Sequence, residues 1–155
     1  MVESLDFLKT DPKARYQGYM FFFREGFCWS NVLTTYIKCR KKQKSIHSTE
    51  SMSFFSMVDC VPEYFMICII NSKLIAYYVD SFVNSTSHCT TGDAKLIPIL
   101  VPTKEQLKTF KLLFDEAVKI RKMVTKEVLN KEATNLLKDI QIKLDIKVAE
   151  LYGII

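Results

Sequence analysis

The sequence predicts an α+β protein, in which a small mixed or antiparallel sheet with a buried helix is followed by a C-terminal helical hairpin. Aromatic and β-branched residues gather in the first third of the chain, as is typical of strands. A mostly apolar stretch follows Pro62 and predicts the buried helix. After Pro102, apolar residues recur at helical spacing, with no Gly or Pro before Gly153. We therefore expect a sheet-containing unit over residues 1–102 and a helical unit over residues 103–155.

The predicted sheet is built from segments of the first third that are rich in aromatic or β-branched residues. A turn signal at residues 24–26 and the start of a basic segment at Lys38 bound them. These strand candidates are residues 17–23, 32–38 and 51–58.

A single helix is predicted over residues 64–83. Pro62 suits the first turn of a helix, and Glu63 suits its positive end. The polar residues of this stretch share one face, which predicts a largely buried helix with one solvated edge: Lys73, Asp80 and Asn84.

Two shorter segments follow this helix. Residues 84–93 are polar and predict a loop. Residues 94–100 predict a short strand, and Pro98 restricts that strand to an edge or a strand end.

The C-terminal unit begins with a capping box, in which Gln106 follows Thr103 at the required spacing. Two apolar stripes then follow at helical spacing. They fit either one rod of roughly 70 Å or two antiparallel helices that meet near residues 125–130. We favour two helices, because each apolar stripe needs a partner.

Composition describes a globular chain in a reducing setting. Of the 155 residues, 48% are hydrophobic and 25% are charged, which excludes a disordered or collagen-like chain. The apolar runs are too short for a bilayer span, and the N-terminus lacks the features of a secretory signal. The five cysteines show no disulfide framework, so we expect a cytoplasmic protein with no membrane partner.

Positive charge is concentrated in one short segment. The net charge is +5, and residues 38–44 contain five cations: Lys38, Arg40, Lys41, Lys42 and Lys44. An isolated basic run fits a solvated loop. It also fits a loop that contacts phosphates, and charge alone leaves both interpretations open.

Residue patterns that carry catalysis are scarce. The four glycines are isolated, which argues against a nucleotide or S-adenosylmethionine fold in this chain. The cysteines form no Cys-x-x-Cys pair, so zinc is not expected, and Cys68 suits a small core residue. His88 and Cys89 are adjacent and point to opposite sides of an extended segment, which disfavours a nucleophile pair. The residues thus indicate a binding module, with no catalytic residue and no metal.

Several phrases, in this order, resemble the target-recognition region of adenine-specific DNA methyltransferases. They are Arg-Glu-Gly-Phe-Cys-Trp-Ser (residues 24–30), Ile-Asn-Ser-Lys-Leu (70–74), Gly-Asp-Ala-Lys-Leu-Ile-Pro-Ile (92–99) and Glu-Leu-Tyr-Gly-Ile (150–154). The resemblance is to the TaqI-like C-terminal specificity domain of type IIG restriction–modification enzymes and to the methyltransferases of BREX phage-defence systems. It covers about residues 20–154.

The resemblance implies a sequence-specific reader of double-stranded DNA, and residues 1–102 would be its target-recognition domain. The catalytic part of that family lies N-terminal to this region and contains an Asn-Pro-Pro-Tyr phrase and a cofactor loop, neither of which occurs here. We therefore expect a fragment that neither methylates nor cleaves DNA. Its partner would be a catalytic domain in cis, which binds S-adenosylmethionine, flips an adenine and in some parent enzymes also cuts.

The resemblance gives weight to two candidate DNA-binding segments. The first is the basic run, where about four phosphate contacts would give log affinity a slope of roughly −3.6 against log salt. The second is the polar loop and the lysine after it: Ser87, His88, Thr90, Thr91 and Lys95. Turn chemistry explains that loop equally well, and Asp93 is expected to cap a turn.

Three further features of the sequence have structural interpretations: a tryptophan, a polar interruption of the predicted helix, and the C-terminal apolar stripes. Trp29 is expected in the core, because large aromatic side chains bury when they can. Asn71, Ser72 and Lys73 could face DNA or form a solvated helix edge. The C-terminal apolar stripes would pack on the catalytic part or form a dimer contact.

Two alternatives remain open. One is a half-length specificity subunit of a type I restriction system, whose recognition domains end in a similar strand and long helix. The other is a helical scaffold or protein-interaction module that does not bind DNA.

Overall fold

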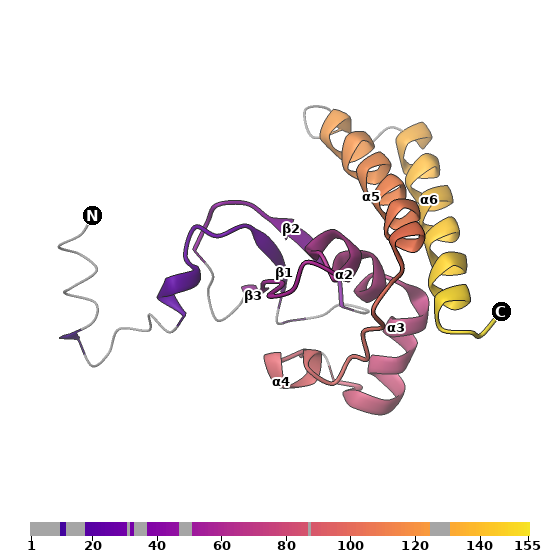
Figure 1. Cartoon of the computed structure of the whole chain (residues 1–155). Helices are drawn as coiled ribbons and strands as arrows, with labels where there is room; N and C mark the ends of the chain where they lie inside the picture. The colour runs from indigo at the N-terminus through magenta and orange to yellow at the C-terminus, as the bar shows by residue number, and fades with distance from the viewer. Residues whose placement is uncertain are drawn as a thin grey trace.

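The computed structural model describes residues 10–11, 18–30, 32, 37–46, 51–86, 88–124 and 131–155. Three strands and a short 3₁₀ turn form one side of the molecule, and a pair of long helices forms the other (Figure 1). The observed architecture is α+β, and it confirms the predicted fold class.

The sheet is small and antiparallel. Strand β1 (Gly26–Ser30) lies between β2 (Arg40–Lys42) and β3 (Ser51–Phe54). Opposite Phe27 stand Lys41 of β2 and Phe54 of β3. The strand predicted within residues 51–58 is confirmed over the four residues of β3.

One other strand prediction needs correction, and a further one falls largely outside the described residues. The aromatic segment 17–23 was predicted as a strand, but its described part forms the 3₁₀ turn η1 (Tyr19–Phe21). Left-handed backbone at Gly18 (φ 74°) and Phe23 (φ 61°) turns the chain there. In the segment 32–38, residues 33–36 lie outside the described residues, and Val32 makes only an isolated bridge to His88.

The predicted turn at residues 24–26 is wrong at Gly26, which begins β1. A Cβ atom at this position would lie 2.4 Å from the Phe54 carbonyl oxygen. Only glycine lets β3 approach this closely, so the residue that suggested a turn is required by strand pairing.

The single helix predicted over residues 64–83 is interrupted. Helix α2 (Glu63–Ile70) ends at Asn71, and α3 (Lys73–Tyr78) continues into a π-helical turn, η2 (Val79–Val83). The bend between the two parts is 61°. Ser72 produces the break, since its backbone is extended and its hydroxyl caps α3 by accepting from the Ile75 N–H.

The short strand predicted over residues 94–100 is also wrong. Residues Thr91–Ala94 form the single-turn helix α4, and the chain then runs through turns without pairing. Thr90 and Asp93 form a reciprocal capping box that favours this helix, and Pro98 removes a backbone donor that a strand would use.

The C-terminal hairpin is confirmed. Helices α5 (Lys104–Val124) and α6 (Lys131–Leu151) lie side by side and antiparallel, and their junction falls outside the described residues (Figure 1). The predicted capping box is present, because the Gln106 N–H donates to the Thr103 hydroxyl and the Thr103 N–H donates to the Gln106 side chain.

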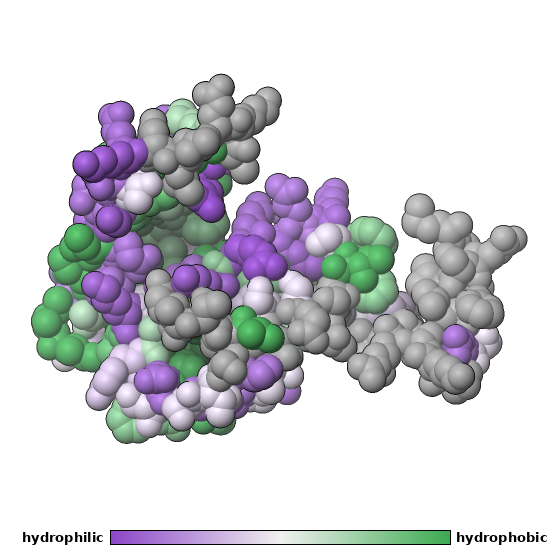
Figure 2. Space-filling view, turned by 180° about the vertical axis from the view of Figure 1, so that it is seen from behind, coloured by the Kyte–Doolittle hydropathy of each residue, from purple (hydrophilic) through white to green (hydrophobic). Residues whose placement is uncertain are grey.

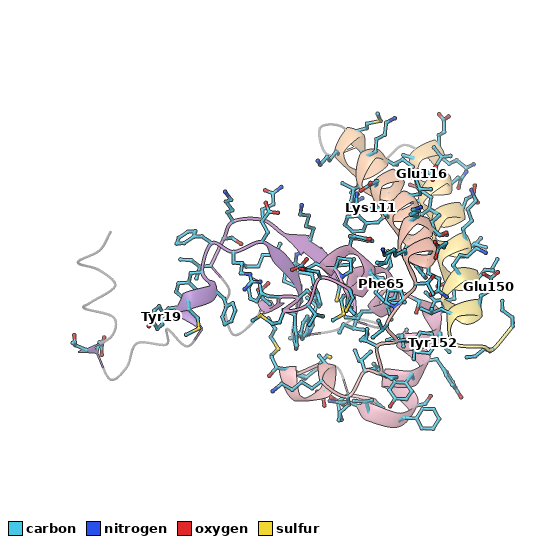
Figure 3. The ribbon with its side chains drawn as sticks, viewed as in Figure 1. Tyr19, Phe65, Lys111, Glu116, Glu150 and Tyr152 are labelled. Atoms are coloured by element: carbon cyan, nitrogen blue, oxygen red, sulfur yellow. The ribbon has the colours of Figure 1, made fainter. Side chains whose placement is uncertain are left out.

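One core joins the sheet, α2 and the hairpin. Phe65 of α2, labelled in Figure 3, meets Phe110 of α5 edge to face, and the ring centroids are 5.1 Å apart. Trp29 is completely buried, as predicted, and its Nε1–H donates to the Cys89 carbonyl. Val148 of α6 belongs to the same cluster, so the two sequence units share their packing.

Within the described residues, no single helix has the length and apolarity needed to cross a bilayer. The bent pair formed by α2 and residues 73–83 meets that test by length and composition alone.

Candidate nucleic-acid interface

The predicted basic loop is an edge strand. Residues 40–42 form β2, which pairs with β1 on one side only. Lys38, Arg40, Lys41 and Lys44 are all exposed. Arg40 donates to the Ser51 hydroxyl across the sheet, and Lys41 lies 3.5 Å from the Glu25 carboxylate. Both partners are themselves at the surface, so these contacts leave the two cations accessible to an anion.

Lys42 must be removed from the predicted phosphate contacts. Its side chain turns inward, and the residue is only 4% exposed. Its Nζ donates to the carbonyls of Arg24 (3.0 Å) and Ser45 (2.6 Å) and lies 5.2 Å from the centre of the Phe55 ring. The ammonium therefore holds the start of β1 to the end of β2, whereas Arg40 and Lys41 of the same strand stay exposed.

Replacing Lys42 with methionine should destabilise the fold by about 2 kcal/mol, since two carbonyls lose a charged donor while the side-chain volume is kept. Urea unfolding of the full chain measures this. Lys41→Met is the matched control at the next, exposed position, and its effect should be within about 0.5 kcal/mol. Equal losses in the two variants would contradict the structural role of Lys42.

A groove separates the basic strand from the hairpin. It has a volume of about 430 Å³ and is lined from β2, α2, α5 and α6. Arg40 and Lys41 line it on the sheet side, and Arg121 and Lys122 line it on the hairpin side. Figure 2 shows a hollow with apolar surface at its base and hydrophilic side chains along its edges. The structure thus places cations from segments eighty residues apart around one opening.

Sequence reasoning missed this second set of cations. Arg121 and Lys122 lie in the last turn of α5, where basic residues also complement the helix dipole. That ordinary explanation hid their proximity to β2, which only the folding of the hairpin onto α2 creates. The available signal was helical spacing. Ala117 and Val118 precede Arg121 and Lys122 by about one turn of α5, and all four residues line the same groove.

The polar loop predicted to contact DNA lies elsewhere. Ser87 is outside the described residues; His88, Thr90, Thr91 and Lys95 are exposed but none of them lines the groove. His88 bridges Val32, just beyond the end of β1 at Ser30, whereas Lys41 pairs near the start of that strand. The structure therefore does not bring the two candidate segments together.

Two side chains of this loop have structural roles. The Thr90 hydroxyl accepts from the Asp93 N–H, and the Asp93 carboxylate accepts from the Thr90 N–H at 2.8 Å and from the Asn84 side chain at 3.0 Å. The hydrogen bonds from Thr90 hold the pKa of Asp93 below its usual value. The predicted capping role of Asp93 is confirmed, although the capped element is α4.

The lowered pKa of Asp93 makes its stabilising effect depend on pH. The folded state gains from the carboxylate above the unfolded pKa of about 4, and loses this gain as pH falls through the lower folded pKa. Asp93→Asn should therefore be less stable than the unmodified chain at neutral pH, and the gap should close below about pH 4. Urea unfolding over a pH series tests this, and a gap that stays constant would contradict it.

Asn71 holds the basic strand to the end of α2. Its side-chain oxygen accepts from the Cys39 N–H at 2.7 Å, and its side-chain nitrogen donates to the Cys39 carbonyl at 2.9 Å. Cys39 directly precedes Arg40. The amide thus imitates a strand partner at the free edge of β2 and fixes where the exposed cations begin.

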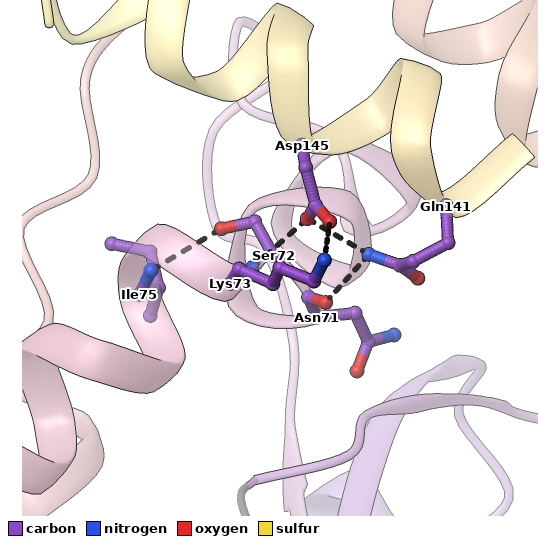
Figure 4. Close-up of polar contacts among 6 residues, drawn as sticks. All are labelled: Asn71, Ser72, Lys73, Ile75, Gln141 and Asp145. Carbon is purple, nitrogen blue, oxygen red and sulfur yellow. Dashed lines mark hydrogen bonds and ion pairs between the residues drawn. The ribbon is translucent and has the colours of Figure 1, made fainter. Parts of the chain in front are cut away.

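The same turn anchors the hairpin (Figure 4). Gln141 of α6 donates to the Asn71 carbonyl at 3.1 Å, and Asp145 accepts from the Lys73 N–H at 2.9 Å. Ser72 is fully buried and also donates to the Ile69 carbonyl. Residues 71–73 therefore form a junction between α2, α3 and α6. The sequence alone allowed either DNA contact or a solvated helix edge for them.

The cysteines lie mainly in the interior. Cys28, Cys39, Cys68 and Cys89 are buried, and Cys60 is exposed. Burial raises the pKa of Cys68 to about 12 and that of Cys89 to about 11. These values disfavour the thiolate form that nucleophilic chemistry needs. Among the described residues, no three His, Cys, Asp or Glu side chains are grouped so that they could hold a metal ion.

The chain was compared with models of protein families and with curated proteins. No family model and no curated protein matches it.

Proposed function

We propose that this chain is a sequence-specific recognition module for double-stranded DNA, belonging to an N6-adenine methyltransferase or a combined restriction–modification enzyme. The observation that supports this proposal most directly is that Arg40 and Lys41 line one wall of a groove and Arg121 and Lys122 line the other. The resemblance of residues 20–154 to target-recognition regions supports double-stranded DNA as the ligand and an adenine methyltransferase as the parent enzyme.

The electrostatics support a polyanion as ligand. The described residues that line the groove include four cations and neither Asp nor Glu. Lys38 and Lys44 extend the exposed positive surface beyond the two ends of β2. An anionic strand running across the opening meets cations from both walls.

The accessible side chains determine which groups contact phosphates and which contact base edges. The exposed cations contact phosphates and fix the register of the duplex. Base edges are contacted by exposed side chains next to the basic strand, such as Gln43, and by the separate polar segment at residues 85–93 where the duplex extends that far. Methyl transfer belongs to a catalytic part with its own S-adenosylmethionine site, and the protein works in the cytoplasm.

Selection from a random duplex library tests the sequence-specific part of this proposal. The full chain is immobilised, bound duplexes are recovered at about 0.1 M salt, and their sequences are compared with the input. We expect one enriched site, because a reader loses about 1–3 kcal/mol per mismatched base pair. A recovered pool with the composition of the input would reduce the chain to a non-specific binder and overturn the sequence-specific reading.

A half-length specificity subunit of a type I restriction system is the second candidate. Exposed apolar side chains on the hairpin helices favour it: Leu112 of α5, and Ile142 and Ile146 of α6. Such a surface suits a separate methyltransferase chain or a second copy of this one. A stable complex with a methyltransferase encoded beside it would favour this candidate over a domain linked in cis.

A further inference from the structure

The groove has a large apolar lining that phosphate contacts would not use. Its floor is apolar and is formed by residues of α2 and both hairpin helices, among them Ile67, Phe114, Ala117 and Leu137. Phosphate contacts need only the cations at the rim. A hollow of about 430 Å³ lies within the range of small-molecule pockets, which are mostly apolar with a few polar groups.

The side-chain amides of Asn71 and Gln141 within the groove already make hydrogen bonds to the protein. The Asn71 side chain is bonded to both backbone groups of Cys39. The Gln141 side-chain nitrogen donates to the Asn71 carbonyl and to Asp145. A ligand that fills the floor therefore gains from apolar burial and meets few open hydrogen-bond partners. This disfavours a nucleobase, whose polar edge would lose its hydrogen bonds to water there.

The rim sets the charge of the ligand. Arg40 and Lys41 come from the sheet side, and Arg121 and Lys122 from the end of α5. The described lining residues include four cations and no acidic side chain, although Lys41 also lies 3.5 Å from the Glu25 carboxylate, so the net charge around the opening favours an anion. We propose that the groove binds an amphipathic organic anion, whose apolar body lies on the floor and whose carboxylate, sulfonate or phosphate group meets the cations at the rim.

The proposal does not rest on DNA recognition, although the two ligands share all four rim cations: Arg40, Lys41, Arg121 and Lys122. Anilinonaphthalene sulfonate is a suitable probe, because it combines an aromatic body with one anionic group and fluoresces when buried. We expect saturable binding by the folded full-length chain and displacement by decanoate. Decanol, which has the same chain and no charge, should compete about tenfold less well.

Ala117→Trp tests the floor. It fills the groove from α5 and leaves every rim cation in place, so the probe should bind more than tenfold more weakly. Leu112→Trp is the matched control, because this position on the same helix is 72% exposed and does not line the groove. Thermal unfolding monitored by circular dichroism establishes that both variants are folded. Unchanged probe binding in a folded Ala117→Trp chain would overturn the proposal.

The rim offers a second test on exposed residues, where folding is not at risk. Arg121→Gln combined with Lys122→Gln should weaken the probe and decanoate about fivefold and leave decanol unchanged. Equal competition by decanoate and decanol, or an equal loss for both in this variant, would contradict the anionic group. Duplex binding by Ala117→Trp should be normal, so a failed groove and a failed DNA surface give different results.

Discussion

Replacing Lys38, Arg40, Lys41 and Lys44 together with alanine is expected to weaken binding to duplex DNA by at least about a hundredfold at about 0.1 M salt. All four side chains are exposed, and none holds the core. Each lost phosphate contact removes about 0.9 from the slope of log affinity against log salt. The variant should therefore lose most of its salt dependence, and the remainder should come from Arg121 and Lys122. Fluorescence anisotropy with a labelled duplex measures both quantities.

The control for this variant removes the same charge from another surface. Lys104, Lys108, Lys138 and Lys143 are exposed on the hairpin and do not line the groove. Their joint replacement with alanine lowers the net charge equally and should leave most of the affinity. If both quadruple variants lost affinity to the same extent, binding would depend on overall charge, and the position of β2 would have no special role.

Asn71→Ala is expected to destabilise the chain by about 3 kcal/mol, which is the largest loss we expect from a single polar residue here. The change leaves the N–H and the carbonyl of Cys39 without partners, and Cys39 is only 7% exposed. It also frees the end of β2, so affinity for DNA should fall even at temperatures where the variant is folded. Urea unfolding gives the stability, and anisotropy gives the affinity.

Asn135→Ala provides the comparison. Asn135 is exposed on α6, and its replacement should change stability by no more than about 0.5 kcal/mol. Similar losses at the two positions would mean that the two hydrogen bonds to Cys39 contribute little. If the Asn71→Ala chain were destabilised but bound DNA with unchanged affinity, the two hydrogen bonds would stabilise the fold without fixing the position of the cations.

The sequence predicted the fold class because its long-range periodicities were strong. Two apolar stripes without an interrupting Gly or Pro were enough for α5 and α6. Shorter elements depended on contacts that no local pattern contains. Gly26 is strand rather than turn because the Phe54 carbonyl approaches it, and the helix breaks at Ser72 because its hydroxyl starts a new one.

The candidate site could be predicted only in part. A run of cations marked β2, but the buried position of Lys42 depends on the carbonyls of Arg24 and Ser45, which no local pattern reveals. The contribution of α5 depends on how the hairpin packs on α2. For Asn71 the sequence left DNA contact and a solvated helix edge equally open, because its partner, Cys39, lies thirty-two residues away.

Titration of a random-sequence duplex with the unmodified chain over a range of salt concentrations tests the central claim most directly. The four exposed cations around β2 and the two on α5 predict micromolar or tighter binding at low salt, with log affinity falling against log salt at a slope of about −5.4. No binding at micromolar protein, or binding that does not change with salt, would contradict a DNA-gripping surface made by these cations.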